Sequence, residues 1–114
     1  MEKVTVLLST YNGEKYLVQQ LDSLLVQADV DVEILVRDDG SQDGTTAILD
    51  DWQKKGLLSW YTSGNLGPGK SFIHLLQTAQ PGGYYAFCDQ DDVWLPQKLS
   101  LTMEKMKAVE RSNA

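Results

Sequence analysis

An apolar run that ends abruptly at carboxylates stands at Tyr84-Tyr85-Ala86-Phe87-Cys88-Asp89-Gln90-Asp91-Asp92-Val93-Trp94. Its first five residues are typical of a buried strand, and three carboxylates follow within four residues. Crowded carboxylates stay ionised together only when a cation or several hydrogen-bond donors compensate them. An Asp-x-Asp pair also gathers the hard oxygen ligands that suit Mg²⁺ or Mn²⁺, which commonly bridge protein carboxylates to phosphate oxygens. The stretch therefore predicts a metal-assisted phosphate or diphosphate site.

The same strand-like pattern occurs three times before this stretch, each time followed by helical periodicity. The earlier runs are Val4–Leu8, Val32–Val36 and Leu57–Tyr61. Near-continuous apolar strands with helical crossovers indicate the α/β class, with a mostly parallel, Rossmann-type sheet and helices on both faces. Helical spacing is carried by Leu17, Leu21, Leu24, Leu25 and Ala28, by Ile48, Leu49 and Trp52, by Phe72, Ile73, Leu75, Leu76 and Ala79, and by Leu99, Met103 and Met106.

Length, charge and cysteine content narrow the class of protein. At 114 residues the chain is expected to form one domain, and its net charge of -6 argues against a nucleic-acid surface or a basic membrane patch. The single cysteine, Cys88, excludes an internal disulfide and fits a reducing compartment. The apolar run Val4–Leu8 is too short for a signal sequence or a membrane segment. We therefore expect a cytoplasmic protein.

The unusual loops all follow a predicted strand. They are Ser9–Gly13, Arg37–Ser41, Gly64–Lys70 and Asp89–Asp92. Parallel sheets bind ligands at the edge where the carboxyl ends of the strands meet. We therefore expect five aspartates from the second and fourth loops to converge on one functional site.

Four motifs in these loops resemble a known enzyme family. They are Leu7–Gly13, Arg37–Thr45, Asn65-x-Gly67 and Cys88–Pro96, and together they resemble the amino-terminal half of family 2 glycosyltransferases, particularly bacterial rhamnosyltransferases. The resemblance implies a truncated GT-A fold, in which residues 1–114 form the nucleotide-diphosphosugar-binding half of the domain. It also implies a hexosyltransferase whose general base is expected beyond residue 114.

The resemblance implies a role for individual residues. Thr10 and Tyr11 are expected to lie against the nucleotide base, and Asp39 is expected to accept a hydrogen bond from the base imide. Asp91 is the expected direct metal ligand, with Asp89 near the ribose or the water shell of the metal. The remaining expected contacts are Asn12, Asn65 and Lys70 with the nucleotide, and Asp92 and Trp94 with the sugar or the acceptor.

The chemistry of glycosyl transfer agrees with an acidic loop. Negative charge grows on the departing diphosphate, and a divalent ion held by Asp-x-Asp stabilises it as a Lewis acid. The expected cofactor is Mn²⁺ or Mg²⁺. The expected partners are a UDP- or dTDP-sugar and a bacterial surface glycan, protein or lipid-linked acceptor. We expect these 114 residues to transfer little sugar alone. A peripheral association with the membrane is expected at its inner face. Exposed sheet edges and apolar patches are expected to produce a homo-oligomer.

Other interpretations remain open from the sequence. Gly64–Ser71 satisfies the P-loop pattern of nucleoside triphosphatases, although it follows the third predicted strand rather than the first. A receiver-like module would hold Mg²⁺ with clustered aspartates, and a glycosidase would use two carboxylates. Several residues also have structural explanations: Ser41 or Asp43 is expected to cap the second helix, Pro96 to open the last one, and Tyr11 and Trp94 are candidates for packing.

Overall fold

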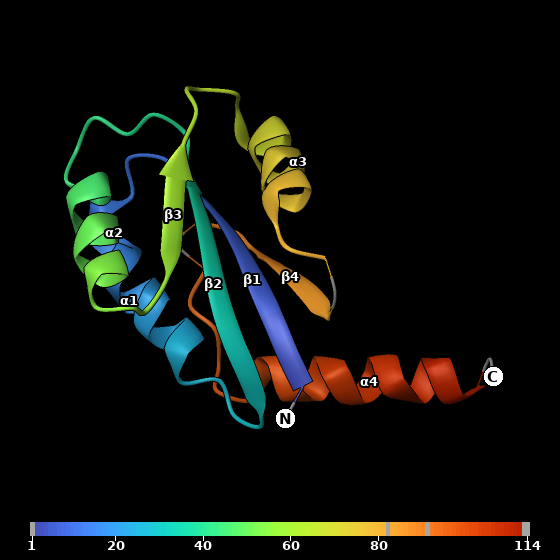
Figure 1. Ribbon diagram of the computed structural model, residues 1–114. Helices are drawn as coiled ribbons and strands as arrows, with labels where there is room; N and C mark the ends of the chain where they lie inside the picture. The colour runs from blue at the N-terminus through green and yellow to red at the C-terminus, as the bar shows by residue number, and fades with distance from the viewer. Residues whose placement is uncertain (1, 82, 91, 113–114) are drawn as a thin grey trace.

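The computed structural model describes residues 2–81, 83–90 and 92–112, with side chains in the last helix described as far as Lys105. Strands and helices alternate along these residues (Figure 1). Their order is β1 (Glu2–Thr10), α1 (Glu14–Leu25), β2 (Val30–Asp38), α2 (Thr45–Lys54), β3 (Ser59–Thr62), α3 (Pro68–Thr78), β4 (Tyr84–Cys88) and α4 (Lys98–Ser112).

The strands form one parallel sheet in the order β3-β2-β1-β4. β1 lies in the middle and pairs with β2 from Glu2 to Thr10, and with β4 from Val4 to Leu8. The chain builds outward from β1 through β2 to β3 and then crosses to the other side of β1. The predicted α/β class and parallel Rossmann-type sheet are confirmed, and the crossing creates a switch point beside the carboxyl end of β1.

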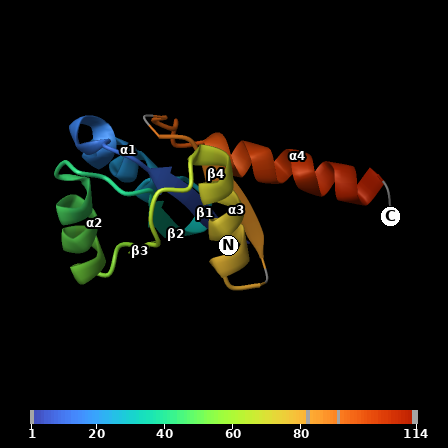
Figure 2. The same cartoon turned by 90° about the horizontal axis from the view of Figure 1, so that it is seen from above.

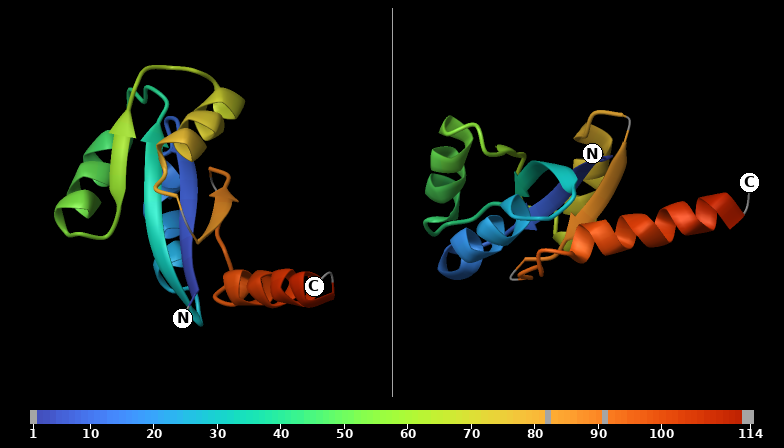
Figure 3. Two further views of the ribbon diagram at one scale, coloured as in Figure 1. Left: turned by 45° about the vertical axis from the view of Figure 1, so that its right-hand side comes forward. Right: turned by 90° about the horizontal axis from the view of Figure 1, so that it is seen from below.

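Helices cover both faces of the sheet (Figure 2). α1 and α2 lie together on one face and α3 lies on the other. Alternation along β1 explains both layers, because Val4, Val6 and Leu8 join the core cluster that contains Leu21, while Ser9 on the opposite face bonds to α3. β4 is an edge strand, and α4 extends away from the sheet (Figure 3). No described helix has the length and apolar character needed to cross a membrane.

Several predicted boundaries were wrong by a few residues. The last helix begins at Lys98, after a turn that contains Pro96, so the proline precedes the helix instead of opening it. The first helix ends at Leu25, short of Ala28. Gly44 is the N-cap of α2 and makes no side-chain cap bond. At the start of α4 the Leu99 amide donates to Gln27, which is distant in sequence, and sequence periodicity does not report such bonds.

The two residues expected to cap the second helix have other tasks. Asp43 Oδ1 accepts the Thr45 amide at 2.9 Å, just before the helix. Ser41 Oγ instead accepts the amide of Asn12 at 2.8 Å, in the loop after β1. The prediction for Asp43 is thus close to the structure, and the capping role expected of Ser41 is wrong.

Candidate functional site

A pocket of about 260 Å³ lies at the carboxyl edge of the sheet, at the switch point beside β1. Four segments that are distant in sequence line it: the end of β1 and its loop, the loop after β2, the start of α3, and the loop after β4. The lining residues are Ser9, Thr10, Tyr11, Asp39, Pro68, Phe72, Asp89 and Gln90. The fold therefore brings together four of the expected site residues, namely Thr10, Tyr11, Asp39 and Asp89.

The loops after β1 and β2 are cross-linked by reciprocal hydrogen bonds. The Asn12 amide donates to Ser41 Oγ, and the Gln42 amide donates back to Asn12 Oδ1, both at 2.8 Å. The Gly13 amide donates to Thr45 Oγ1 at 3.0 Å. Asn12 adopts a φ of 49°, in the left-handed region that asparagine tolerates better than most residues. Asn12 thus locks the two loops together, and it does not line the pocket.

The Asp38 carboxylate uses all of its acceptor sites for bonds within these loops. Its Oδ1 accepts the hydroxyls of Thr10 at 2.8 Å and Ser41 at 2.6 Å. Its Oδ2 accepts the amides of Gly40 at 3.1 Å and Ser41 at 2.8 Å. A carboxylate offers about four lone-pair sites, so this side chain has no remaining acceptor capacity. Asp38 is therefore a structural residue, despite its place beside Asp39.

Asp39 is almost as well bonded but keeps one acceptor site. Its Oδ1 accepts Arg37 Nη1 and the Leu66 amide, both at 2.7 Å, and Oδ2 accepts the Gly67 amide at 3.0 Å. Burial alone raises the pKa of Asp39, but the Leu66 amide, the Arg37 guanidinium and the Gly67 amide outweigh it, so the pKa is lowered. The carboxylate is ionised, fixed in place, and free to accept one more hydrogen bond at Oδ2.

Arg37 organises the same region from inside the protein. It is fully buried, and it donates to Ser71 Oγ at 2.9 Å, to the Gly64 carbonyl at 2.7 Å, and to Ser63 Oγ. These bonds tie β2 to the loop that precedes α3. Sequence reasoning missed this role, although a charged residue inside an apolar strand is a usable signal, because a buried charge needs partners.

The contacts of Gly64–Ser71 argue against a phosphate-cradling loop. Two of its amides, from Leu66 and Gly67, donate to Asp39. Its Ser71 hydroxyl bonds to Ser9 Oγ at 2.6 Å and to Arg37. A P-loop directs its amides at phosphate. Here they serve a carboxylate of the protein itself, so the P-loop match has a structural explanation.

The acidic loop after β4 is anchored by a polar stripe of three residues, Gln20 and Ser23 on α1 and Gln27 just after the end of that helix. Gln20 Nε2 donates to the Asp89 carbonyl at 2.5 Å, and Ser23 Oγ accepts the Trp94 amide at 3.1 Å. Gln27 donates to the Leu95 carbonyl at 2.8 Å and accepts the amide of Leu99 at 3.0 Å, and all three stripe residues are buried. Sequence reasoning missed this stripe as well, although the i, i+3 spacing of Gln20 and Ser23 places these two residues on one helix face.

The carboxylates of this loop have different surroundings. Asp89 is exposed at the pocket, and no other described residue donates to its carboxylate. Asp92 Oδ2 instead accepts Trp94 Nε1 at 3.1 Å and lies 3.9 Å from Lys98 Nζ. Asp91, the expected metal ligand, lies outside the described residues. Within the described part of the chain no three His, Cys, Asp or Glu side chains group as a metal site. Of the five aspartates expected to converge, Asp39 and Asp89 line the same pocket.

The remaining expected site residues lie away from the pocket. Asn65 and Lys70 are exposed and are not among its lining residues. Trp94 is buried under the ammonium of Lys98, which lies 4.5 Å from the ring centroid, and belongs to the core. Trp94 and Asp92 line a separate hollow of about 390 Å³. The missed pocket residues are Ser9, Pro68, Phe72 and Gln90.

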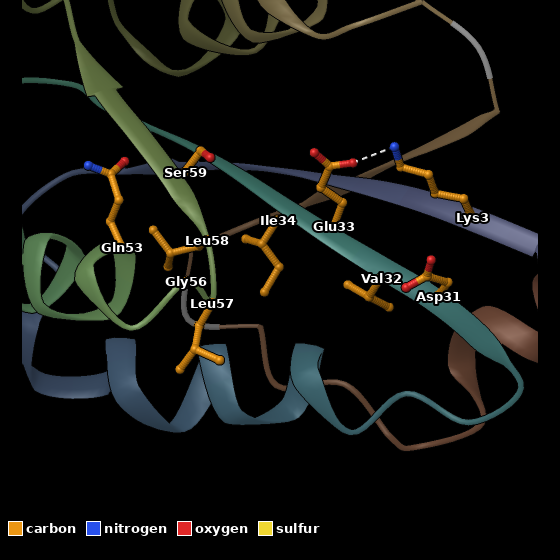
Figure 4. Close-up of a pocket in the computed structure, with 10 residues that line it drawn as sticks. All are labelled: Lys3, Asp31, Val32, Glu33, Ile34, Gln53, Gly56, Leu57, Leu58 and Ser59. Carbon is orange, nitrogen blue, oxygen red and sulfur yellow. Dashed lines mark ion pairs between the residues drawn. The ribbon is translucent and has the colours of Figure 1, made fainter.

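A larger hollow of about 590 Å³ lies at the opposite end of the sheet (Figure 4). It adjoins the first half of β2, which extends beyond the register of β3. Its lysine, Lys3, pairs with Glu33 at 2.6 Å, and both side chains are more than half exposed. Ligands of parallel sheets bind at the carboxyl ends of strands, so the smaller pocket is the better candidate.

Comparisons with known proteins identify the family. A model of the family "Glycosyl transferase family 2" matches residues 5–114. The dTDP-rhamnosyl transferase RfbG of Shigella flexneri is 36% identical over 98 residues, which cover 81% of this chain and 34% of RfbG. The chain thus spans about a third of the length of this relative.

Two solved structures share the fold. Residues 1–349 of S. aureus TarS, crystallised with UDP, superpose with a TM-score of 0.79 at 31% identity, over 93% of this chain and 32% of that one. The mannosyltransferase PcManGT from Pyrobaculum calidifontis, solved with GDP-Man and Mn²⁺, gives 0.68 at 26% identity, over 86% and 30%. The expected GT-A fold is confirmed, and the chain belongs to glycosyl transferase family 2.

Proposed function

We propose that this chain binds the nucleotide-diphosphate sugar of a glycosyltransferase, in the pocket beside β1. One observation carries the proposal: two different carboxylates line the same pocket. Asp39 is held by the protein and keeps one acceptor site, whereas Asp89 receives no donor from the described residues. A nucleotide diphosphate needs both kinds of partner: a fixed acceptor for an N–H of the base, and a divalent cation, which an unpaired carboxylate can hold, for the phosphates. The UDP and dTDP in the names of the relatives support this ligand class.

Tyr11 and Asp39 would hold the base. The Tyr11 side chain is 47% exposed and lines the pocket, so its ring is available to stack. The free acceptor site on Asp39 suits the imide N–H of uracil or thymine. Adenine has no imide N–H, so a site of this type discriminates against ATP.

Asp89 and Asp91 would hold Mn²⁺ or Mg²⁺. The fit rests on the donor set, because Asp89 presents hard oxygens in the pocket without a protein partner among the described residues. When bound, the ion supplies Lewis-acid stabilisation to the departing diphosphate. The Mn²⁺ named with PcManGT supports this choice. Asp92 is the weaker candidate, since its carboxylate already contacts Trp94 and Lys98.

The acceptor side of the reaction is also part of the proposal. We infer transfer to a bacterial surface glycan, protein or lipid-linked acceptor on the cytoplasmic side, with a general base outside these 114 residues. An inverting transfer needs a base beside the acceptor hydroxyl. Asp92 and Trp94 remain candidate contacts for the sugar or the acceptor, through their separate hollow.

Titration calorimetry with UDP, dTDP and ATP, each with and without Mn²⁺, tests the proposal. We expect UDP or dTDP to bind with Mn²⁺ present, ATP to bind at least tenfold more weakly, and Asp91→Ala to abolish the effect of the metal. Asp22→Ala removes an exposed aspartate of α1 outside the pocket and serves as the matched control. Preference for ATP, or unchanged UDP binding in Asp91→Ala, would refute the site.

A further inference from the structure

Gln90 holds the main chain of Tyr11 from both sides. Gln90 Oε1 accepts the Tyr11 amide at 2.5 Å, and Gln90 Nε2 donates to the Tyr11 carbonyl at 2.9 Å. One carboxamide therefore satisfies both backbone groups of the residue whose ring is the stacking candidate. Only glutamine and asparagine carry a carboxamide, which places a donor and an acceptor on the same carbon, and asparagine is one methylene shorter.

The backbone beside this contact has room for the glutamine because residue 13 is glycine. A Cβ on Gly13 would lie 2.8 Å from Gln90 Oε1 and 3.0 Å from Gln90 Cδ. The φ of Gly13 is -106°, which any residue adopts. Residue 13 is therefore a glycine because a side chain there would collide with Gln90, and not because of its backbone conformation.

The other end of Gln90 is also fixed. The preceding residue, Asp89, has its carbonyl bound at 2.5 Å by the buried Gln20 of α1. Gln90 therefore connects two walls of the pocket. One wall is the loop after β1, which contains Tyr11, and the other is the loop after β4, which contains Asp89. In the sheet, β4 lies on the opposite side of β1 from β2. The residues on these walls are 79 positions apart in sequence.

We propose that Gln90, the central residue of the Asp-Gln-Asp sequence, is a positioning residue that fixes Tyr11 relative to the acidic loop. The inference rests on the proposed function, since it assigns Gln90 to the orientation of the base. A nucleotide diphosphate spans both walls, so a fixed separation removes the ordering cost of one wall when the ligand binds. Gln90 acts through Tyr11 and needs no contact with the ligand.

Two variants at this position test the role. Gln90→Ala removes both bonds, and Gln90→Glu keeps the shape but places an anionic oxygen against the Tyr11 carbonyl. We expect each to weaken UDP binding about threefold to tenfold in calorimetry with Mn²⁺. Gln77→Ala, at an exposed position of α3 outside the pocket, is the matched control and should leave the affinity unchanged.

A double-mutant cycle separates positioning from general damage. In a Tyr11→Ala background the ring is absent, so Gln90→Ala should cause no further loss of UDP affinity. An equal loss in both backgrounds would overturn the proposal.

Amide hydrogen exchange at Tyr11 provides a readout that needs no ligand. The Tyr11 amide should exchange at least tenfold faster in Gln90→Ala than in the wild type. Unchanged exchange would overturn the proposal even if UDP affinity fell. A wild-type chain that binds no nucleotide diphosphate would instead refute the proposed function, and the exchange measurement would still decide whether Gln90 holds Tyr11.

Discussion

The loops after β2 and β4 both carry neighbouring aspartates, yet the protein treats them in opposite ways. Around Asp38 and Asp39, seven hydrogen bonds come from the protein itself. Around Asp89, the described residues supply no donor to the carboxylate. The first loop is almost saturated by protein donors, with one acceptor site left on Asp39, and the second presents an exposed carboxylate at the pocket.

The contrast follows from what surrounds each pair. The β2 loop is followed by Gly40 and Ser41, whose amides fold back on Asp38, and it is preceded by the buried cation Arg37. In the β4 loop Gln20 instead binds the Asp89 carbonyl, the Gln90 side chain binds the backbone of Tyr11, and the Asp89 side chain stays exposed. Identical residue types therefore receive donors from the protein in one loop and are exposed without a donor from the described residues in the other.

The largest expected effect comes from breaking the β2 region at Arg37. Arg37→Met should lower the free energy of unfolding by about 3–5 kcal/mol, because Asp39 remains buried without its cation. Urea denaturation measures the loss. Lys54→Met, which removes an exposed partner of Asp50, should cost no more than about 0.5 kcal/mol. A similar small loss in both variants would show that the buried ion pair does not organise the loop.

A direct comparison of the two loops uses the same substitution in each. Asp38→Asn should cost about 1–3 kcal/mol of stability, since asparagine offers one acceptor oxygen to the four donors that the carboxylate satisfies with two. Asp89→Asn should change stability by less than about 0.5 kcal/mol. Equal urea midpoints for the two variants would remove the distinction between scaffold and ligand site.

The acid side of the stability curve gives a smaller effect. Because the pKa of Asp39 is lowered from 3.8 in the folded protein, its contribution is complete above the unfolded pKa and is lost as the pH falls through the folded pKa. The wild type should therefore lose stability below about pH 4 more steeply than Asp39→Asn. Urea unfolding over roughly pH 5 to 2.5, which spans the ordinary pKa values of carboxyl groups, measures both slopes. Parallel slopes would contradict the assignment.

The smallest effect concerns the thiol beneath the acidic loop. Burial raises the pKa of Cys88 to about 11. Alkylation by iodoacetamide at about pH 8 should therefore be on the order of a hundredfold slower in the folded chain than in urea. Mass spectrometry follows the reaction at this single cysteine. Rapid labelling of the folded chain would mean that the β4 loop does not stay closed over its strand.

Much of the fold was predictable because its signals are local. Apolar runs such as Val4–Leu8 and Tyr84–Cys88 predicted their strands, and the spacing of Leu17, Leu21 and Leu24 predicted a helix. The expectation that ligand residues gather at the carboxyl edge also followed, since it depends only on a parallel sheet. Helix ends were less accurate, because the β4 loop and its bonds to Gln27 decide where α4 begins.

The site was only partly predictable. Tyr11, Asp39 and Asp89 were expected and line the pocket, whereas Asn12, Asn65 and Lys70 do not. Asn12 illustrates the reason, because its side chain bonds to a loop 30 residues away. A motif identifies the residue type at a position, but its partners depend on loops that become neighbours only after folding.

The sequence by itself determined the class of fold, the family and the edge of the sheet where a ligand would bind, because periodicity and short motifs encode these properties locally. Only the tertiary structure decided which acidic side chains were already satisfied. Hydrogen bonds between distant segments made Asp38 a scaffold, left Asp39 one acceptor site, and joined Gln90 to Tyr11. The number of acidic residues in a sequence therefore does not show how many carboxylates can bind a ligand, because folding decides how many hydrogen-bond donors each carboxylate already has.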